Sequence, residues 1–145
     1  MNVIPRIGFV AVLLAACASG PTSRTVYLLG EEALNANGEG KYTPVNVRVF
    51  QLTDRARFEE ADFDSLWRND PEVLGDSLVE TVGAVVTTAP EQVEVPLVSG
   101  PSVRFVGIVA LFNREGGLWR RCVAVDEVED WLFRFREYQI LQEER

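Results

Sequence analysis

The stretch VNVRVFQL, Val45 to Leu52, decides the fold class of this 145-residue chain. Val45, Val47 and Val49 alternate with the polar residues Asn46 and Arg48. Successive side chains of a β-strand point to opposite faces of the sheet, so this alternation predicts a strand that buries one face. The rest of the chain is therefore expected to supply the sheet and the core that this strand requires.

Further strand-like runs follow along the chain, separated by segments rich in Gly, Pro, Asn and Ser that favour turns. The run ending in Phe112 is apolar nearly throughout, which predicts a central strand covered on both faces. The number and spacing of these short runs predict a mainly β, two-sheet sandwich. The runs are Thr25 to Leu29, Ser77 to Val86, Glu91 to Leu97, Arg104 to Phe112, Leu118 to Val125 and Trp131 to Leu141, the last long enough for one bent strand or two short ones.

One segment, DRARFEEADFDSLWRND, breaks the β pattern. Phe63, Leu66 and Trp67 recur at helical spacing, and Pro71 is expected to end the run. Asp54 and Asp62 are candidate N-caps. We predict a helix, or two short helical turns, from about Arg55 to Arg68, inserted between strands and packed against the sandwich.

The first residues have the features of a secretory signal peptide. Arg6 precedes an apolar run from Ile7 to Leu14, and two small residues, Ala15 and Ala16, follow it. A membrane-spanning helix needs about 20 apolar residues, so this run is too short to be one. The prediction is a signal peptide over residues 1–16.

Cys17 follows this signal directly, and three interpretations compete for it. Leu14, Ala15, Ala16 and Cys17 resemble the lipobox of bacterial lipoproteins, in which the cysteine is acylated and becomes the new N-terminus. The alternatives are an ordinary signal peptide with an incidental cysteine and a disulfide with Cys122. We expect lipidation, which implies a palmitate-type anchor at Cys17, a tether over residues 17–24 and a sandwich domain over 25–145. Ala18 stands where lipoproteins retained in the inner membrane have Asp, which favours the outer membrane.

The charge and composition exclude several classes of function. Twenty-two acidic residues against 14 basic ones give a formal net charge of -8, which opposes nucleic acid binding. The chain has no histidine, so histidine-based catalysis and metal ligation are excluded. The carboxylate pairs are interpreted as solvated charges or helix caps. The run Asp126 to Asp130 lacks the ligand spacing of a calcium loop. Trp119 and Trp131 are expected in the core or an interface. No catalytic residue, metal or cofactor is predicted. The carboxylate pairs are Glu31/Glu32, Glu59/Glu60 and Asp62/Asp64.

Four stretches together resemble the TssJ family, the outer-membrane lipoproteins of bacterial type VI secretion systems. They are LNANGEGKYTPVNVRVFQL from Leu34, ADFDSL from Ala61, VLGDSL from Val73, and FVGIVALF with LWR between Phe105 and Arg120. The resemblance implies a transthyretin-like sandwich with an extra helix, on the periplasmic face of the outer membrane. It also implies a non-enzymatic role: docking the periplasmic domain of TssM in the TssJ–TssL–TssM membrane complex. A periplasmic lipoprotein that binds a small ligand or glycan, and a hydrolase that uses carboxylates, remain as alternatives.

The partner-binding surface is predicted on the connection between the first two strands, Gly30 to Pro44. A hairpin connection is typically about two to five residues long, so this one is longer than turning the chain requires. It combines turn-forming Asn and Gly residues with apolar side chains, and the resemblance implies that this loop engages TssM. The alternative surface is the helical segment from Phe58 to Trp67. The predicted contact residues are Glu31, Glu32, Ala33, Leu34, Asn35, Ala36, Asn37, Gly38 and Tyr42.

Overall fold

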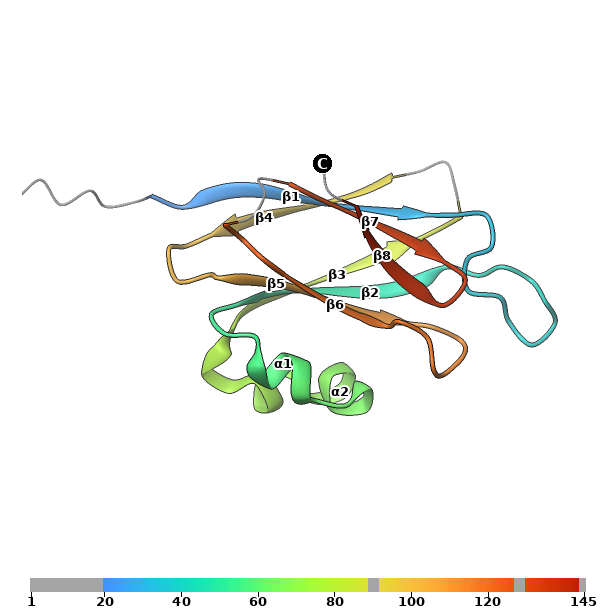
Figure 1. Cartoon of the computed structure of the whole chain (residues 1–145), viewed down its shortest axis with the longest axis horizontal. Coiled ribbons are helices and arrows are strands. Elements are labelled where there is room, and N and C mark those ends of the chain that lie inside the picture. Colours follow the sequence, from blue (N-terminus) through green and yellow to red (C-terminus); the bar gives the residue numbers. More distant parts are fainter. Residues whose placement is uncertain (1–19, 89–91, 127–129, 144–145) are drawn as a thin grey trace, which may run out of the picture.

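The computed structural model describes residues 20–88, 92–126 and 130–143. In this part of the chain the strands form two four-stranded sheets, in the orders β4-β1-β7-β8 and β3-β2-β5-β6, with a helical layer on the outer face of the second sheet (Figure 1). The predicted sandwich with a helical insertion is therefore confirmed. The strands are β1 (Thr22–Gly30), β2 (Val45–Leu52), β3 (Leu78–Val86), β4 (Gln92–Ser99), β5 (Phe105–Leu111), β6 (Arg120–Ala124), β7 (Trp131–Arg136) and β8 (Gln139–Glu143).

The predicted signal peptide and Cys17 lie outside the described residues. Strand β1 begins at Thr22, three residues before the strand expected at Thr25, because Thr22 to Arg24 pair with the end of β4. The run Trp131 to Leu141 forms two strands, β7 and β8, joined by a tight turn in which Glu137 has a φ of 51°. Residues other than glycine rarely adopt that conformation, so the sequence alone did not distinguish two short strands from one bent strand.

The main core lies between the two sheets. Val45, Val47 and Val49 of β2 are all buried there, as their alternation predicts. The opposing sheet contributes the larger side chains, and aliphatic residues of β5 fill the space between. The largest buried members of this core are Trp131, Phe133, Phe135, Leu28, Leu34, Leu97 and Ile108.

A second core lies between β2, β5 and the helices α1 (Ala56–Glu60) and α2 (Phe63–Leu74), which is followed by a short 3-10 turn, η1 (Gly75–Ser77). Phe58 of α1 and Leu66 of α2 are fully buried against Val109 of β5. Strand β5 is thus a central strand covered on both faces, as predicted. The other buried members of this second core are Phe50, Leu52 and Leu74.

The helical segment starts as predicted but ends later. The Asp62 carboxylate caps α2, as predicted, by accepting a 2.9 Å hydrogen bond from the Ser65 amide. The N-cap of α1 is Arg55, not the predicted Asp54, although the Asp54 carboxylate accepts a 2.8 Å hydrogen bond from the Ala56 amide. Pro71 does not end the segment. The backbone leaves the helical conformation at Asn69 (φ -145°, ψ 38°), and a further turn containing Pro71 continues to Leu74. Proline is tolerated in the first turn of a helix, so helical structure can restart after Asn69 with Pro71 in its first turn.

Candidate partner-binding surface

The predicted binding loop connects strands of different sheets. Strand β1 pairs with β4 and β7, whereas β2 pairs with β3 and β5, so residues 31–44 cross from one sheet to the other. The comparison with a hairpin turn is therefore wrong for this loop. Packed sheets lie about 10 Å apart, which a few extended residues can cross, so the loop is still longer than the crossing needs.

The loop lies at the end of the sandwich opposite the start of β1. Figure 1 shows β1 running the length of its sheet, from Thr22 at one end to the β1–β2 loop at the other. A nine-residue strand spans about 30 Å at the usual rise per residue. The loop is therefore held away from the end at which the N-terminal segment joins the domain.

Two of the predicted contact residues, Leu34 and Asn35, have side chains that are buried inside the domain. Leu34 is 0% exposed and belongs to the core between the sheets, and Asn35 is 1% exposed. Their role as contacts stays a prediction, and in this structure their side chains are covered. A leucine buried from within a loop fixes that loop to the core, and a buried amide must find hydrogen-bond partners.

Asn35 satisfies this requirement with every polar group it has. Its side-chain amide donates to the Thr43 hydroxyl (3.0 Å) and to the Pro44 carbonyl (3.1 Å), and its side-chain oxygen accepts from the Asn113 amide nitrogen (2.7 Å). Its backbone N–H donates to the Glu137 carbonyl (2.8 Å). The φ of 48° is a left-handed conformation that Asn adopts more readily than most residues. Asn35 thus closes the base of the loop.

The tip of the loop is a defined turn built on Asn37. The Asn37 side-chain oxygen accepts hydrogen bonds from the amides of Glu39 and Lys41, each 3.0 Å long. The Asn37 amide donates to the Lys41 carbonyl (2.8 Å), and Gly40 takes a φ of 75°. Asparagine side chains commonly organise turns through such local bonds. The predicted turn chemistry of Asn37 and Gly40 is confirmed, and Gly38 beside them is exposed.

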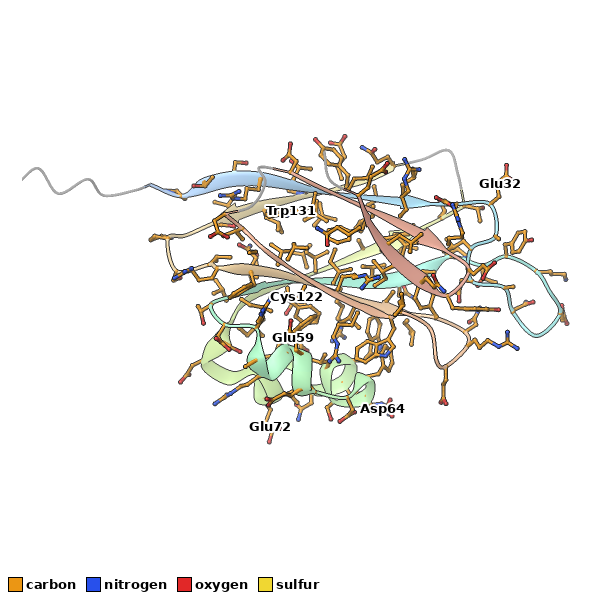
Figure 2. The ribbon with its side chains drawn as sticks, in the orientation of Figure 1. Glu32, Glu59, Asp64, Glu72, Cys122 and Trp131 are labelled. Atoms are coloured by element: carbon orange, nitrogen blue, oxygen red, sulfur yellow. The ribbon has the colours of Figure 1, made fainter. Side chains whose placement is uncertain are left out.

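The first residues of the loop are fixed by arginines of β7. The Glu31 carboxylate pairs with Arg136 and lies 3.8 Å from Arg134. The hydrogen bond and the charge of Glu31 raise the pKa of the Arg136 guanidinium. These side chains line an open groove of about 460 Å³ together with Glu32 and Ala33. Glu31 is therefore mainly an anchor of the loop, whereas Glu32 is exposed at its edge (Figure 2).

Neighbouring turns also hold the loop, through contacts that no local sequence pattern predicts. The Tyr138 hydroxyl of the β7–β8 turn donates to the Ala36 carbonyl (2.9 Å). Asn113 of the β5–β6 loop bonds both Asn35 and Thr43. These contacts join residues 70 or more positions apart in sequence. Among the predicted contact residues, Tyr42 is the large side chain left open to solvent, with 58% of its surface exposed.

The described carboxylate candidates lie on different parts of the domain. Figure 2 shows Glu59, Asp64 and Glu72 on the helical layer, away from Glu32 at the loop end. Among the described residues, no group of Cys, Asp and Glu side chains is arranged to hold a metal ion. Burial, with a smaller effect of the Glu59 charge, raises the pKa of the Cys122 thiol to about 12. The thiolate needed for nucleophilic chemistry is therefore scarce at neutral pH.

Trp119 and Trp131 pack against the interior of the domain, as predicted. Trp131 is buried between the sheets, and Trp119 packs edge-on against Phe63 with ring centroids 5.2 Å apart. Cys122 lies in β6, half-buried beside the second core, with a free thiol.

Within the described part of the chain, no helix is long and apolar enough to cross a membrane.

A family model described as "Type VI secretion lipoprotein, VasD, EvfM, TssJ, VC_A0113" matches residues 22–141. The chain belongs to this family of type VI secretion lipoproteins. The match begins at the start of β1 and ends within β8, so it covers both sheets, the helical insertion and the β1–β2 loop. The family membership indicated by the four stretches is thereby confirmed. No curated protein matches the chain in sequence.

Solved structures from type VI secretion systems share the fold. The crystal structure of the T6SS lipoprotein TssJ1 from Pseudomonas aeruginosa has a TM-score of 0.79 at 23% identity, over 86% of this chain and 97% of that one. A chain of a structure described as "Type VI membrane complex" has a TM-score of 0.76 at 22% identity, over 85% and 98%. A chain of a structure described as the T6SS protein TssM C-terminal domain (869-1107) from EAEC has a TM-score of 0.71 at 20% identity, over 85% and 98%.

Proposed function

We propose that this chain is an outer-membrane lipoprotein that docks the periplasmic domain of TssM and so anchors the TssJ–TssL–TssM membrane complex. Acylated Cys17 is the membrane attachment in this proposal, and the β1–β2 loop is the contact surface. Membership of the type VI secretion lipoprotein family supports the general role. The observation that carries the specific role is the β1–β2 loop itself, which is long, fixed by the buried Asn35, and placed at the far end of β1.

This arrangement suits a protein that must hold a periplasmic partner close to a membrane. The segment between Cys17 and Thr22 is short, so the start of β1 stays near the lipid surface. Two or three acyl chains make such an attachment effectively permanent, whereas one chain binds only marginally. The opposite end of the domain, which carries the loop, then faces the periplasm, where a TssM domain can reach it.

The proposed role is structural, not catalytic. The sequence has no histidine, and the thiol of Cys122 is half-buried with a raised pKa. Large side chains such as Trp131, Phe133 and Ile108 fill the space between the sheets, which leaves little room for the small ligand or glycan of the alternative interpretation. Docking of a protein partner uses the surface instead.

The test replaces only the tip of the loop, because Leu34 and Asn35 belong to the core and its hydrogen-bond network. A Gly-Ser sequence of the same length replaces residues Asn37 to Tyr42. This change removes the Asn37 turn and the exposed Tyr42 ring and leaves the buried residues in place. We expect the purified domain to unfold at nearly the same temperature as the parent and to lose most of its affinity for the TssM periplasmic domain in calorimetric titration.

A matched control changes the alternative surface on the helical layer. Asp64→Lys and Glu72→Lys reverse two exposed charges of α2 without touching either core. Unchanged TssM binding by this control, together with a loss in the tip variant, supports the β1–β2 loop. The reverse pattern would place the docking surface on α2.

A further inference from the structure

The β1–β2 loop is clamped by one side chain from another loop. Asn113, between β5 and β6, donates from its side-chain amide to the Asn35 carbonyl (3.1 Å) and to the Thr43 hydroxyl (2.8 Å). Its backbone N–H donates to the side-chain oxygen of Asn35 (2.7 Å). Asn35 and Thr43 lie at the base of the loop, on either side of the tip, and they also bond each other. The Asn113 side chain therefore bridges the two sides of the loop base, which are also bonded directly to each other.

The β7–β8 turn makes a second contact with the loop. The Tyr138 hydroxyl donates to the carbonyl of Ala36, the residue before the tip. The Tyr138 ring packs edge-on against Phe112 (centroids 6.3 Å apart), and the Arg114 guanidinium lies 5.6 Å from its centre. Phe112 and Arg114 flank Asn113 in sequence, so the packing of Tyr138 also holds the segment that carries Asn113 in place.

The β5–β6 loop and the β7–β8 turn also meet without a gap. A Cβ atom at Gly117 would lie 2.0 Å from the Tyr138 carbonyl oxygen, far inside van der Waals contact. Only glycine allows the two backbones to approach so closely. The neighbouring turns therefore form a fixed support on which the tip rests.

We propose that the β5–β6 loop and the β7–β8 turn set the conformation of the β1–β2 loop, with Asn113 and Tyr138 as positioning residues for docking. This inference rests on the proposed function and extends its site from one loop to three. The physical reason is preorganisation: a segment already held in its bound conformation loses less conformational entropy on binding, so its affinity is higher for the same contacts. Residues that need not touch TssM then control how tightly it binds.

The cleanest probe is Thr43, because it permits two matched substitutions. Thr43→Ser keeps the hydroxyl that bonds Asn35 and Asn113, whereas Thr43→Val keeps the shape and removes the hydroxyl. Tyr138→Phe similarly removes one hydroxyl and keeps the ring packing. We expect Thr43→Val and Tyr138→Phe to bind the TssM periplasmic domain about three- to tenfold more weakly than the parent, and Thr43→Ser to bind equally well.

Amide hydrogen exchange of the free domain separates a positioning role from a loss of overall stability. In Thr43→Val and Tyr138→Phe, the amides of Glu39 and Lys41 should exchange faster, while those of the central strand β5 keep the parent rate. Asn69→Ala is the control, because it removes an exposed amide whose side-chain bond is to Glu72 within α2. It should change neither the exchange of the tip nor the affinity.

A double substitution tests whether Asn113 acts through Thr43 or touches the partner itself. Asn113→Ala and Thr43→Val remove the same hydrogen bond, so their effects on affinity should be less than additive. Additive effects, or equal binding by Thr43→Ser and Thr43→Val, would overturn the inference. If the Gly-Ser tip variant binds as tightly as the parent, the proposed function of the loop fails. If that variant loses binding but the Thr43 pair does not differ, only the positioning role fails.

Discussion

Phe58 of α1 lies directly over Gly107 of β5. A Cβ atom at residue 107 would come within 2.6 Å of the Phe58 ring, which is closer than packed carbon atoms can approach. The absence of a side chain on this central strand thus lets the helical layer settle onto the sheet. Phe58 also contacts Phe50 of β2, with ring centroids 5.5 Å apart, so the same glycine fixes the position of an aromatic pair.

Gly107→Ala is therefore expected to destabilise the domain. Inserting a methyl group into a packed core usually costs about 1–3 kcal/mol, and here the ring of Phe58 must move to make room. Urea unfolding of the purified domain measures the change. Gly83→Ala on the edge strand β3 is the matched control, since a Cβ at that position meets no atom within 4 Å. Equal free energies of unfolding for the two variants would show that the helical layer does not depend on this contact.

The local pattern of the sequence predicts those elements whose burial follows their own period. Strand β2 was predicted to its end residues because three valines alternate with polar residues over its length. The cap at Asp62 is also predictable from a short segment, because it depends on a hydrogen bond to Ser65, three residues away. In both cases the deciding interactions are encoded within one short segment.

The conformation of the β1–β2 loop is predicted less completely, because several of its contacts are distant in sequence. Leu34 is a lone apolar residue among turn-forming residues, and no periodicity distinguishes a buried leucine there from an exposed one. Besides its local partners Thr43 and Pro44, Asn35 bonds Asn113, 78 positions away, and this contact depends on how the sheets are connected. That β1 and β2 belong to different sheets is likewise a property of the whole fold. A buried asparagine in a turn-rich loop shows its role only when the long-range partners are known.

The Cys122 thiol should react slowly with thiol reagents in the folded domain. Burial raises its pKa to about 12, so almost none of it is thiolate at pH 8. In the unfolded chain the pKa returns to about 8.5, and labelling by a chromogenic disulfide reagent should become fast in denaturing urea. Rapid labelling of the folded domain at pH 8 would contradict the burial of this side chain.

The same shift makes the stability of the domain depend on pH at the alkaline end. A thiol whose pKa is higher in the folded than in the unfolded state contributes stability that is complete below the unfolded pKa. That contribution is lost as the pH rises from about 9 towards 12. The free energy of unfolding should fall more steeply over this range in the parent than in Cys122→Ala, which cannot titrate there. Parallel curves for the two proteins would show that the thiol titrates equally in both states.

If Cys17 carries the acyl anchor proposed above, Cys17→Ser is expected to release the protein from the membrane. If the acylated Cys17 is the sole attachment, the variant should fold and appear in the soluble periplasmic fraction. Cell fractionation in a strain that lacks TssM measures this without the partner holding the protein in place. Cys122→Ser is the control, and it should stay with the membrane. Recovery of Cys17→Ser in the outer-membrane fraction would mean that another segment attaches the domain to lipid.

Leu34 and Tyr42 lie in the same loop and are expected to separate stability from binding. Leu34 is fully buried between the sheets, so Leu34→Ala removes core packing and should lower the free energy of unfolding by about 2–5 kcal/mol. Tyr42 is 58% exposed, so Tyr42→Ala should change stability by no more than about 0.5 kcal/mol. Its ring is nevertheless the largest apolar surface that the loop offers to a partner, and aromatic side chains of this kind often dominate binding energy.

Tyr42→Ala should therefore weaken binding to the TssM periplasmic domain by about tenfold or more, the loss typical of a central interface tyrosine. Urea unfolding and calorimetric titration on the same preparations give both quantities. At a temperature where Leu34→Ala is still folded, any loss of its affinity for TssM should come only from a more mobile β1–β2 loop. If Tyr42→Ala binds TssM as tightly as the parent while the Gly-Ser tip variant does not, the contact is made by the backbone and by the polar residues around Asn37. If neither change affects binding, the partner must dock on another face of the domain.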